Sequence, residues 1–227
     1  MVLRAAREGA AEGYACVAAE QTEGRGRQGR EWTAPPGTAL LASVLIRRSP
    51  AVASGIPFAA GLALVDVLAT AHGVAAGLKW PNDVLVDGRK LAGILCEVEP
   101  AGADEDVAVA LGLGVNLRVE RFAGGIEAVS LHTLVANPPA AEELLMAWGA
   151  ALGTRIAMLE RGGISALLTD WRGVAGGLGG PVTVHGPSGI VAGVAVDVGD
   201  DGALLVEASG RTHRFLAGDV HLGPSQG

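Results

Sequence analysis

The sequence predicts an α+β fold followed by a small all-β module, and three features support this prediction. Short apolar, strand-like runs separated by turn signals fill the first half of the chain, around an Asp-Gly turn at residues 87–88. Apolar residues between 144 and 171 recur at helical spacing. After a glycine-rich stretch at 173–180, short strands joined by turns return. The 227 residues can form one sizeable core and a small second domain.

Composition narrows the class of protein. Hydrophobic residues make up 49% of the chain and charged residues 18%, which is enough apolar surface to offset the entropy of ordering. The formal net charge of -7 argues against a broad basic face that grips nucleic acid or an anionic membrane. The two cysteines, Cys16 and Cys96, lack C-x-x-C spacing and are predicted to be small core hydrophobes.

Mean hydropathy is +0.37, so membrane and targeting segments need examination. The most apolar stretch, 54–78, is interrupted by Asp66 and His72 and has no uninterrupted apolar span of the ~20 residues that a bilayer requires. It is interpreted as a buried helix. Residues 1–12 mix arginine with glutamate, which is unlike a signal or transit peptide. The sequence therefore predicts a cytoplasmic protein.

The first half of the chain is predicted to contain two strands and two helices. Residues 2–11 are interpreted as the end of a helix that begins upstream of the chain, because no capping residue precedes them. Residues 14–19 suit a buried strand and 40–46 the next one, with a loop at 21–37 between them. Residues 54–72 are predicted to form a helix with Ser54 at its N-cap and Pro57 in its first turn.

The second half continues with strands, then helices, then the β-module. Residues 84–86 and 90–98 are predicted to pair as a hairpin around the Asp-Gly turn, and 107–117 to form another strand. Two helices are expected at 144–159 and 164–171, and short strands at 182–185, 190–198 and 204–207. We expect a first domain at 1–177 and a second at 178–227.

An arginine-rich loop, GRGRQGREW at 24–32, is the first candidate site. It matches G-x-G-x-x-G, but Pro35-Pro36-Gly37 prevents the helix that a dinucleotide fold requires, and the partner motifs of a protein kinase are missing. Glycine allows close backbone approach, while guanidinium groups match carboxylate and phosphate oxygens. The loop is predicted to wrap anions; the alternative is a solvated basic turn.

Lys90 is the second candidate. Strand alternation predicts that Lys90, Ala92, Ile94 and Cys96 share one face, which would place Lys90 at the rim of a pocket if that face points inward. A strand-end lysine that reaches into solvent is an equally good interpretation.

Three further polar residues stand out. Asn82 and Asp83 follow Pro81 and can be ordinary turn formers. Asn116 ends an apolar strand and would need a hydrogen-bond partner there.

Four segments in one order resemble the biotin protein ligase family: GRGRQGREW at 24–32, KWPND at 79–83, RKLAGIL at 89–95 and GLGVNL at 112–117. The resemblance implies an α+β catalytic domain with a mixed β-sheet flanked by helices, similar to class II aminoacyl-tRNA synthetases, followed by an SH3-like β-barrel. It also implies an enzyme that uses ATP and Mg²⁺ to attach biotin, through biotinyl-5′-AMP, to a lysine of a biotin carboxyl carrier domain of a carboxylase.

The resemblance also implies roles for particular residues. Those expected to line the biotin site are Gln21, Gly24, Arg25, Gly26, Arg27 and Lys90. Those expected to hold ATP or the adenylate are Arg25, Arg27, Trp32, Lys79, Asn82, Asp83 and Asn116. Arg25, Arg27, Lys90 and Asp83 are the expected catalytic residues, and Asp83 is the hypothetical proton acceptor in transfer to the carrier. The metal ligands are not assigned.

The chain departs from the family pattern at its start. The Ser/Thr-Thr-Asn element that the family usually carries upstream of its first helix is missing, so an incomplete biotin pocket is expected. The chain also leaves no room for an N-terminal DNA-binding domain, and no nucleic-acid or membrane partner is expected. A monomer or weak homodimer is predicted. The alternatives are a lipoate protein ligase and a non-catalytic nucleotide or anion sensor.

Overall fold

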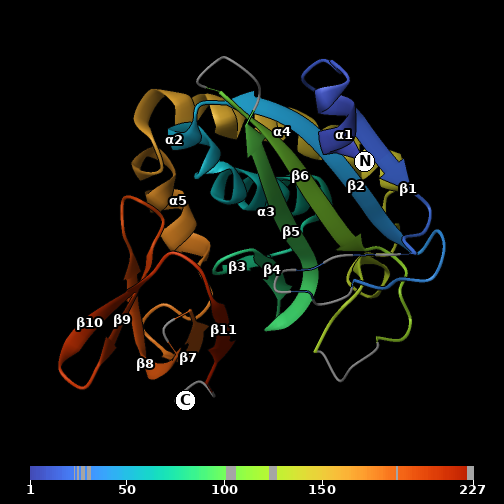
Figure 1. Ribbon diagram of the computed structural model, residues 1–227. Coiled ribbons are helices and arrows are strands. Elements are labelled where there is room, and N and C mark those ends of the chain that lie inside the picture. Colours follow the sequence, from blue (N-terminus) through green and yellow to red (C-terminus); the bar gives the residue numbers. More distant parts are fainter. Residues whose placement is uncertain are drawn as a thin grey trace.

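The computed structural model describes residues 1–22, 24, 26, 29, 32–100, 106–122, 127–187 and 189–223. Its larger part is built on a six-stranded sheet in the order β1-β2-β6-β5-β4-β3 (Figure 1). The strands are β1 (Ala15–Ala18), β2 (Ala39–Arg48), β3 (Gly77–Lys79), β4 (Asp83–Val86), β5 (Arg89–Pro100) and β6 (Val107–Asn116). The α+β class is therefore confirmed.

Every strand pair in this sheet is antiparallel. Parallel pairing is limited, among the described residues, to two isolated bridges, Leu78 with Ala175 and Lys90 with Ala128, so the sheet is less mixed than expected. The predicted hairpin of β4 and β5 is confirmed. Its turn residues, Asp87 and Gly88, both have positive φ (49° and 75°), the backbone geometry that a tight two-residue hairpin favours.

Helices cover one face of the sheet. They are α2 (Pro50–Ala53), α3 (Ile56–His72), α4 (Ala141–Gly162) and α5 (Ser165–Val174). Helix α3 lies next to the sheet, and α4 packs against α3 (Figure 1). Because α3 is enclosed by the sheet, α4 and α5, its apolar residues from Phe58 to Leu68 are buried around the helix, whereas Ala69 and Ala71 in its last turn are exposed. No helix of the described part of the chain is long and apolar enough to cross a membrane.

The start of α3 differs from the prediction. Gly55 occupies the N-cap position, and Ser54 instead ends α2, where its hydroxyl donates to the Ala51 carbonyl at 2.8 Å. The reason is local: Pro50, with its fixed φ, begins a separate helical turn directly before α3. Pro57 does lie in the first turn of α3, as predicted.

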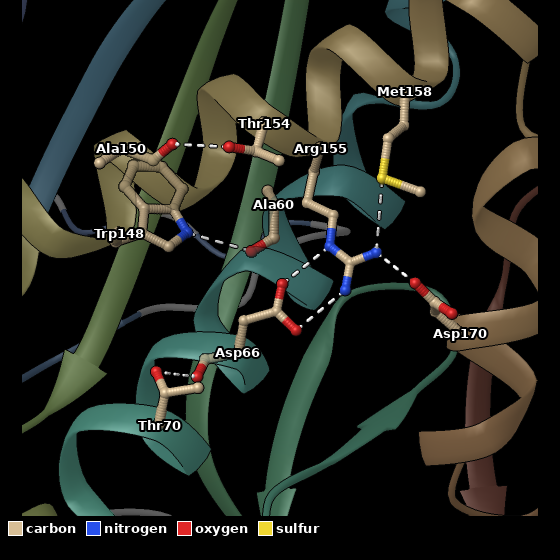
Figure 2. Close-up of polar contacts among 9 residues, drawn as sticks. All are labelled: Ala60, Asp66, Thr70, Trp148, Ala150, Thr154, Arg155, Met158 and Asp170. Carbon is tan, nitrogen blue, oxygen red and sulfur yellow. Dashed lines mark hydrogen bonds and ion pairs between the residues drawn. The ribbon is translucent and has the colours of Figure 1, made fainter.

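One arginine ties the three longer helices together (Figure 2). Arg155 of α4 donates from Nε and Nη2 to the two Asp66 carboxylate oxygens of α3 at 2.8 and 2.9 Å, and from Nη1 to Asp170 of α5. Nearby, the Trp148 indole of α4 donates to the Ala60 carbonyl of α3 at 3.0 Å. These contacts fix the helix layer behind the sheet.

A short helix, α1 (Val2–Arg7), lies on the other face of the sheet, against Leu45 of β2 and Ala108 and Ala110 of β6. It is shorter than the predicted 2–11. Strand β1 was expected to be buried, but within the described ranges it is an edge strand that pairs only with β2, and its Val17 is exposed. Apolar composition alone does not distinguish an edge strand from a central one.

The C-terminal module is a second antiparallel sheet, in the order β10-β9-β8-β7-β11. Its strands are β7 (Pro181–Gly186), β8 (Gly189–Val198), β9 (Leu204–Ala208), β10 (Arg211–Phe215) and β11 (Asp219–Leu222). The expected all-β module is confirmed. Among the described residues β10 and β11 are its unpaired edges, so the strand pairing does not close a barrel as the resemblance implied.

Candidate active site

The candidate site lies on the face of the six-stranded sheet opposite α3. Residues that pair directly across strands share a face, so the register identifies the side chains on it. One row crosses β2, β6, β5, β4 and β3 as Leu41, Gly114, Gly93, Asp83 and Lys79. The neighbouring row contains Ser43, Gly112 and Leu95. Three glycines therefore leave the centre of this face without side chains.

Trp32 covers part of this glycine face. Its ring lies so close to β6 and β5 that a Cβ at Gly114 would be 2.8 Å from it, and a Cβ at Gly93 3.1 Å. The Trp32 backbone N–H donates to the Gly24 carbonyl at 3.1 Å, which closes the base of the loop. The indole Nε1 is buried and has no hydrogen-bond partner within the described ranges. A buried donor of this kind can bind an acceptor on a ligand.

Lys90 points to the same face, which corrects the predicted alternation. The register of β4 and β5 slips at Leu91, so that Leu85 pairs with Lys90 but Val84 pairs with Ala92. This bulge turns Lys90 away from Ile94, whose side chain packs toward α3, and places Lys90 Nζ 3.4 Å from an ideal Cβ at Gly93. The ammonium group also lies 5.5 Å from the centroid of the Trp32 ring.

Two lysines share one carboxylate at the edge of this face. Lys90 Nζ lies 2.5 Å from Asp83 Oδ1, and Lys79 Nζ lies 3.0 Å from Asp83 Oδ2. Burial would raise the pKa of the Asp83 carboxyl, but the charges of Lys90 and Lys79 outweigh it and hold that pKa below its ordinary value. The cluster keeps one positive charge in excess, as an anion-binding site requires.

The two asparagines brace the backbone around these charges. Asn116 is 5% exposed, and its Nδ2 donates to the carbonyls of Lys90 at 3.3 Å and Val129 at 3.2 Å. Asn82 Nδ2 donates to the Ile94 carbonyl at 2.7 Å. Both amide groups therefore hold β5 in place. Asn116 has the hydrogen-bond partners that it was predicted to need.

The remaining predicted residues belong to the loop. Gly24 is buried, and a Cβ there would be 2.0 Å from the Trp32 carbonyl oxygen and 3.1 Å from Gln21 Oε1. Gly26 is half-buried. Arg25 and Arg27 lie outside the described residues. The structure thus brings Trp32, Lys79, Asp83 and Lys90 together.

Gly93 and Gly114 were not among the predicted site residues, although both fall in the motifs at 89–95 and 112–117. A glycine inside a strand often marks the close approach of another group, and that signal was available. The sequence-based prediction also missed Val129, which binds both Asn116 and the backbone of Lys90. No local pattern indicates this contact, because it joins segments far apart in the sequence.

The described residues contain no group of three or more His, Cys, Asp or Glu side chains that could hold a metal ion. Asp83 already shares its two oxygens with lysines. In ATP-binding sites Mg²⁺ commonly binds through one or two carboxylates together with the phosphates of the nucleotide.

Comparison with known families defines the class of protein. Residues 7–116 match the Biotin/lipoate A/B protein ligase family, and residues 177–223 match the Biotin protein ligase C terminal domain. The first match contains the glycine face, Trp32 and the two lysines, and the second contains the whole C-terminal sheet.

Individual relatives narrow the class. A biotin ligase for acetyl-CoA carboxylase from Paracoccus denitrificans is 36% identical over 91% of this chain and 89% of its own length. The corresponding ligase from Mycobacterium tuberculosis is 37% identical over 97% of this chain and 83% of its own. The biotin protein ligase of Aquifex aeolicus, solved with biotin and ATP, has the same fold, with a TM-score of 0.82 at 24% identity, and the match covers 99% of this chain and 94% of that one. The chain belongs to the biotin protein ligase family.

The role of the glycine face in ligand binding can be tested by adding a side chain to it. Gly114→Ala would place a methyl group 2.8 Å from the Trp32 ring, so we expect the ring to move and the binding of biotin and ATP to weaken about 10-fold or more. Isothermal titration calorimetry measures both affinities. The matched control is Gly149→Ala on an exposed part of α4, where a Cβ meets nothing within 4 Å; it should leave binding unchanged. Equal affinities in both variants would contradict the assignment of this face.

The charge cluster predicts a pH dependence of stability. Because the folded pKa of Asp83 is lowered, its stabilising effect is present above its unfolded pKa of about 3.9 and is lost as the pH falls through the folded pKa. Asp83→Asn should therefore cost about 1–3 kcal/mol at pH 7, less than a fully buried pair because both lysines are part-exposed. Denaturant unfolding from pH 7 to pH 2 should give a shallower decline for the variant. Parallel curves would argue against the pairing.

Proposed function

We propose that this chain attaches biotin to a lysine of a biotin carboxyl carrier domain, using ATP and passing through biotinyl-5′-AMP. The carrier would belong to a carboxylase, as the acetyl-CoA carboxylase ligases among its relatives suggest. The observation that carries this proposal is the placement of Lys90 and Trp32 over the glycines of β5 and β6. At this place the Lys90 ammonium group and the buried Trp32 indole N–H lie next to backbone that carries no side chains.

The first step brings two anions together. A biotin carboxylate oxygen attacks the α-phosphorus of ATP, a new O–P bond forms, and the bond to the β-phosphate oxygen breaks to release pyrophosphate. The enzyme must hold both reactants and stabilise the charge that develops on the phosphoryl oxygens. We assign the stabilising charge to Lys90, assisted by Arg25 and Arg27. Their guanidinium groups suit paired contacts with carboxylate and phosphate.

Binding roles follow from position. Biotin would lie against the glycine face and contact Gln21, Gly24, Gly26 and Lys90, together with Arg25 and Arg27. The adenylate would contact Trp32 and Lys79, with the same two arginines. Asn82 and Asn116 would support the ATP and adenylate site indirectly, because their Nδ2 groups donate to backbone carbonyls of β5.

In the second step the lysine amine of the carrier loses a proton and attacks the mixed anhydride, and AMP leaves. Asp83 is the candidate proton acceptor, but the lowered pKa of its carboxyl makes it a weak base, and both of its oxygens are engaged by ammonium groups. These contacts favour a different role, in which Asp83 positions Lys79 and Lys90 in both steps.

The remaining assignments complete the proposal. Mg²⁺ would enter with the phosphates of ATP, because the described residues offer no acidic cluster of their own. The catalytic domain would comprise residues 1–177 and the C-terminal domain 178–227. The protein would act in the cytoplasm, as a monomer or weak homodimer, without a nucleic-acid or membrane partner.

The decisive experiment is exchange between labelled pyrophosphate and ATP. Exchange that depends on biotin, followed by transfer of labelled biotin to a carrier domain, is the expected result, and Lys90→Ala should abolish both. Exchange only with lipoate would indicate a lipoate ligase instead. Tight binding of ATP or biotin with no exchange would indicate a sensor, and either result would overturn the proposal.

The role of Asp83 can be separated by comparing the two steps. Asp83→Asn should slow adenylate formation and transfer by similar factors of about 10–100, because both lysines lose their shared anchor. Single-turnover measurements with pre-formed biotinyl-5′-AMP isolate the transfer step. Slowing confined to transfer would establish Asp83 as the proton acceptor and contradict the positioning role.

A further inference from the structure

The C-terminal sheet contacts the segment that carries the charge cluster. The indole Nε1 of Trp80 donates to the Gly202 carbonyl, in the turn between β8 and β9, at 3.0 Å. Trp80 is 3% exposed and follows Lys79 directly, three residues before Asp83. A buried indole that lost this acceptor would leave an unsatisfied donor, so the contact resists opening.

The turn around Gly202 is shaped to make this contact. Gly202 has a φ of +81°, and a Cβ there would be 2.9 Å from the Phe58 ring of α3. The turn therefore reaches the helix layer at a point where only glycine fits. Its backbone is also fixed from inside, because Gly202 N–H donates to the Gly199 carbonyl at 2.8 Å.

Two further sets of contacts support this region: one joins α5 to the C-terminal sheet, and the other joins the segment after α5 to β3. Arg172 of α5 donates to both carboxylate oxygens of Asp197 on β8, at 2.6 and 3.0 Å, and to the Val198 carbonyl. The Gly176 N–H donates to the Leu78 carbonyl of β3 at 2.7 Å. Leu78 and Trp80 thus flank Lys79: the segment that follows α5 holds Leu78, and the C-terminal sheet holds Trp80.

The space beneath the hairpin is not completely filled by side chains. A small cavity lies there, and its lining includes Gly61, Asn82 and Trp171. Strand β3 is only three residues long, and in the part of the chain that the structure describes its one neighbour in the sheet is β4. The position of Lys79 and Asp83 therefore depends on what holds the ends of this short strand.

We infer that Trp80 is a positioning residue, which uses the Gly202 carbonyl of the C-terminal sheet to hold Lys79 and Asp83 in register with Lys90. The role rests on the proposed function, since it matters only if this cluster binds the reacting groups. Trp80 acts through the charge cluster and does not itself touch the substrate.

The chain offers a matched control. Trp148 is fully buried, and its indole also donates to a backbone carbonyl, that of Ala60, at 3.0 Å, but this hydrogen bond joins α4 to α3 and involves neither the hairpin nor the C-terminal sheet (Figure 2). Trp80→Phe and Trp148→Phe each remove one such hydrogen bond and keep an aromatic ring. A purely structural role for Trp80 predicts that the two variants behave alike.

We expect Trp80→Phe to lower kcat for biotin-dependent pyrophosphate–ATP exchange about 10-fold, with the KM for biotin changed by less than about 2-fold. Trp148→Phe should change neither. In an Asp83→Asn background Trp80→Phe should add less than about 2-fold, because both substitutions act on the same contact network. Equal kcat values for the two tryptophan variants, or fully multiplicative effects with Asp83→Asn, would overturn the inference.

Failure of the positioning role of Trp80 can be distinguished from failure of the proposed function. If Lys90→Ala keeps full exchange activity, the assignment of the charge cluster is wrong. If Lys90→Ala is inactive while Trp80→Phe matches Trp148→Phe, the cluster stands and the positioning role of Trp80 fails.

Discussion

The site depends on one electrostatic constraint: a single carboxylate balances two ammonium groups at the end of a short hairpin. Without Asp83, Lys79 and Lys90 would repel one another across the strand pair. With it, they are held close while one positive charge remains for an incoming anion. The other features of the site adjoin this charge cluster. The glycines of β5 and β6 leave room beside it for the Trp32 ring, and the hydrogen bonds of Asn82 and Asn116 hold the backbone of β5.

Features set by neighbouring residues were predictable from the sequence. The Asp87-Gly88 turn favours positive φ at both positions, so the hairpin of β4 and β5 could be placed closely. The helical spacing of apolar residues likewise located α4 and α5. The family resemblance rested on motifs that the structure gathers onto one face, although no residue pattern alone showed that they meet.

Features set by distant contacts were not predictable in this way. Strict alternation placed Lys90 beside Ile94, and only the bulge at Leu91 reverses its direction. The exposure of β1 follows from its place at the sheet edge, which its composition does not encode. Ser54 has good capping chemistry, but the preceding Pro50 starts a helix of its own. In each case tertiary or neighbouring structure overrides a local preference.

The docking of Trp80 against Gly202 has a consequence for biosynthesis. The two residues are 122 positions apart. At ribosomal speeds of about 5–20 residues per second, the hairpin would wait roughly 6–24 s for its acceptor to be translated. Nascent chains and fragments ending before this turn would carry the whole sheet yet lack the contact that orients its charges. The charge cluster would thus reach its final arrangement only after the turn between β8 and β9 has been made.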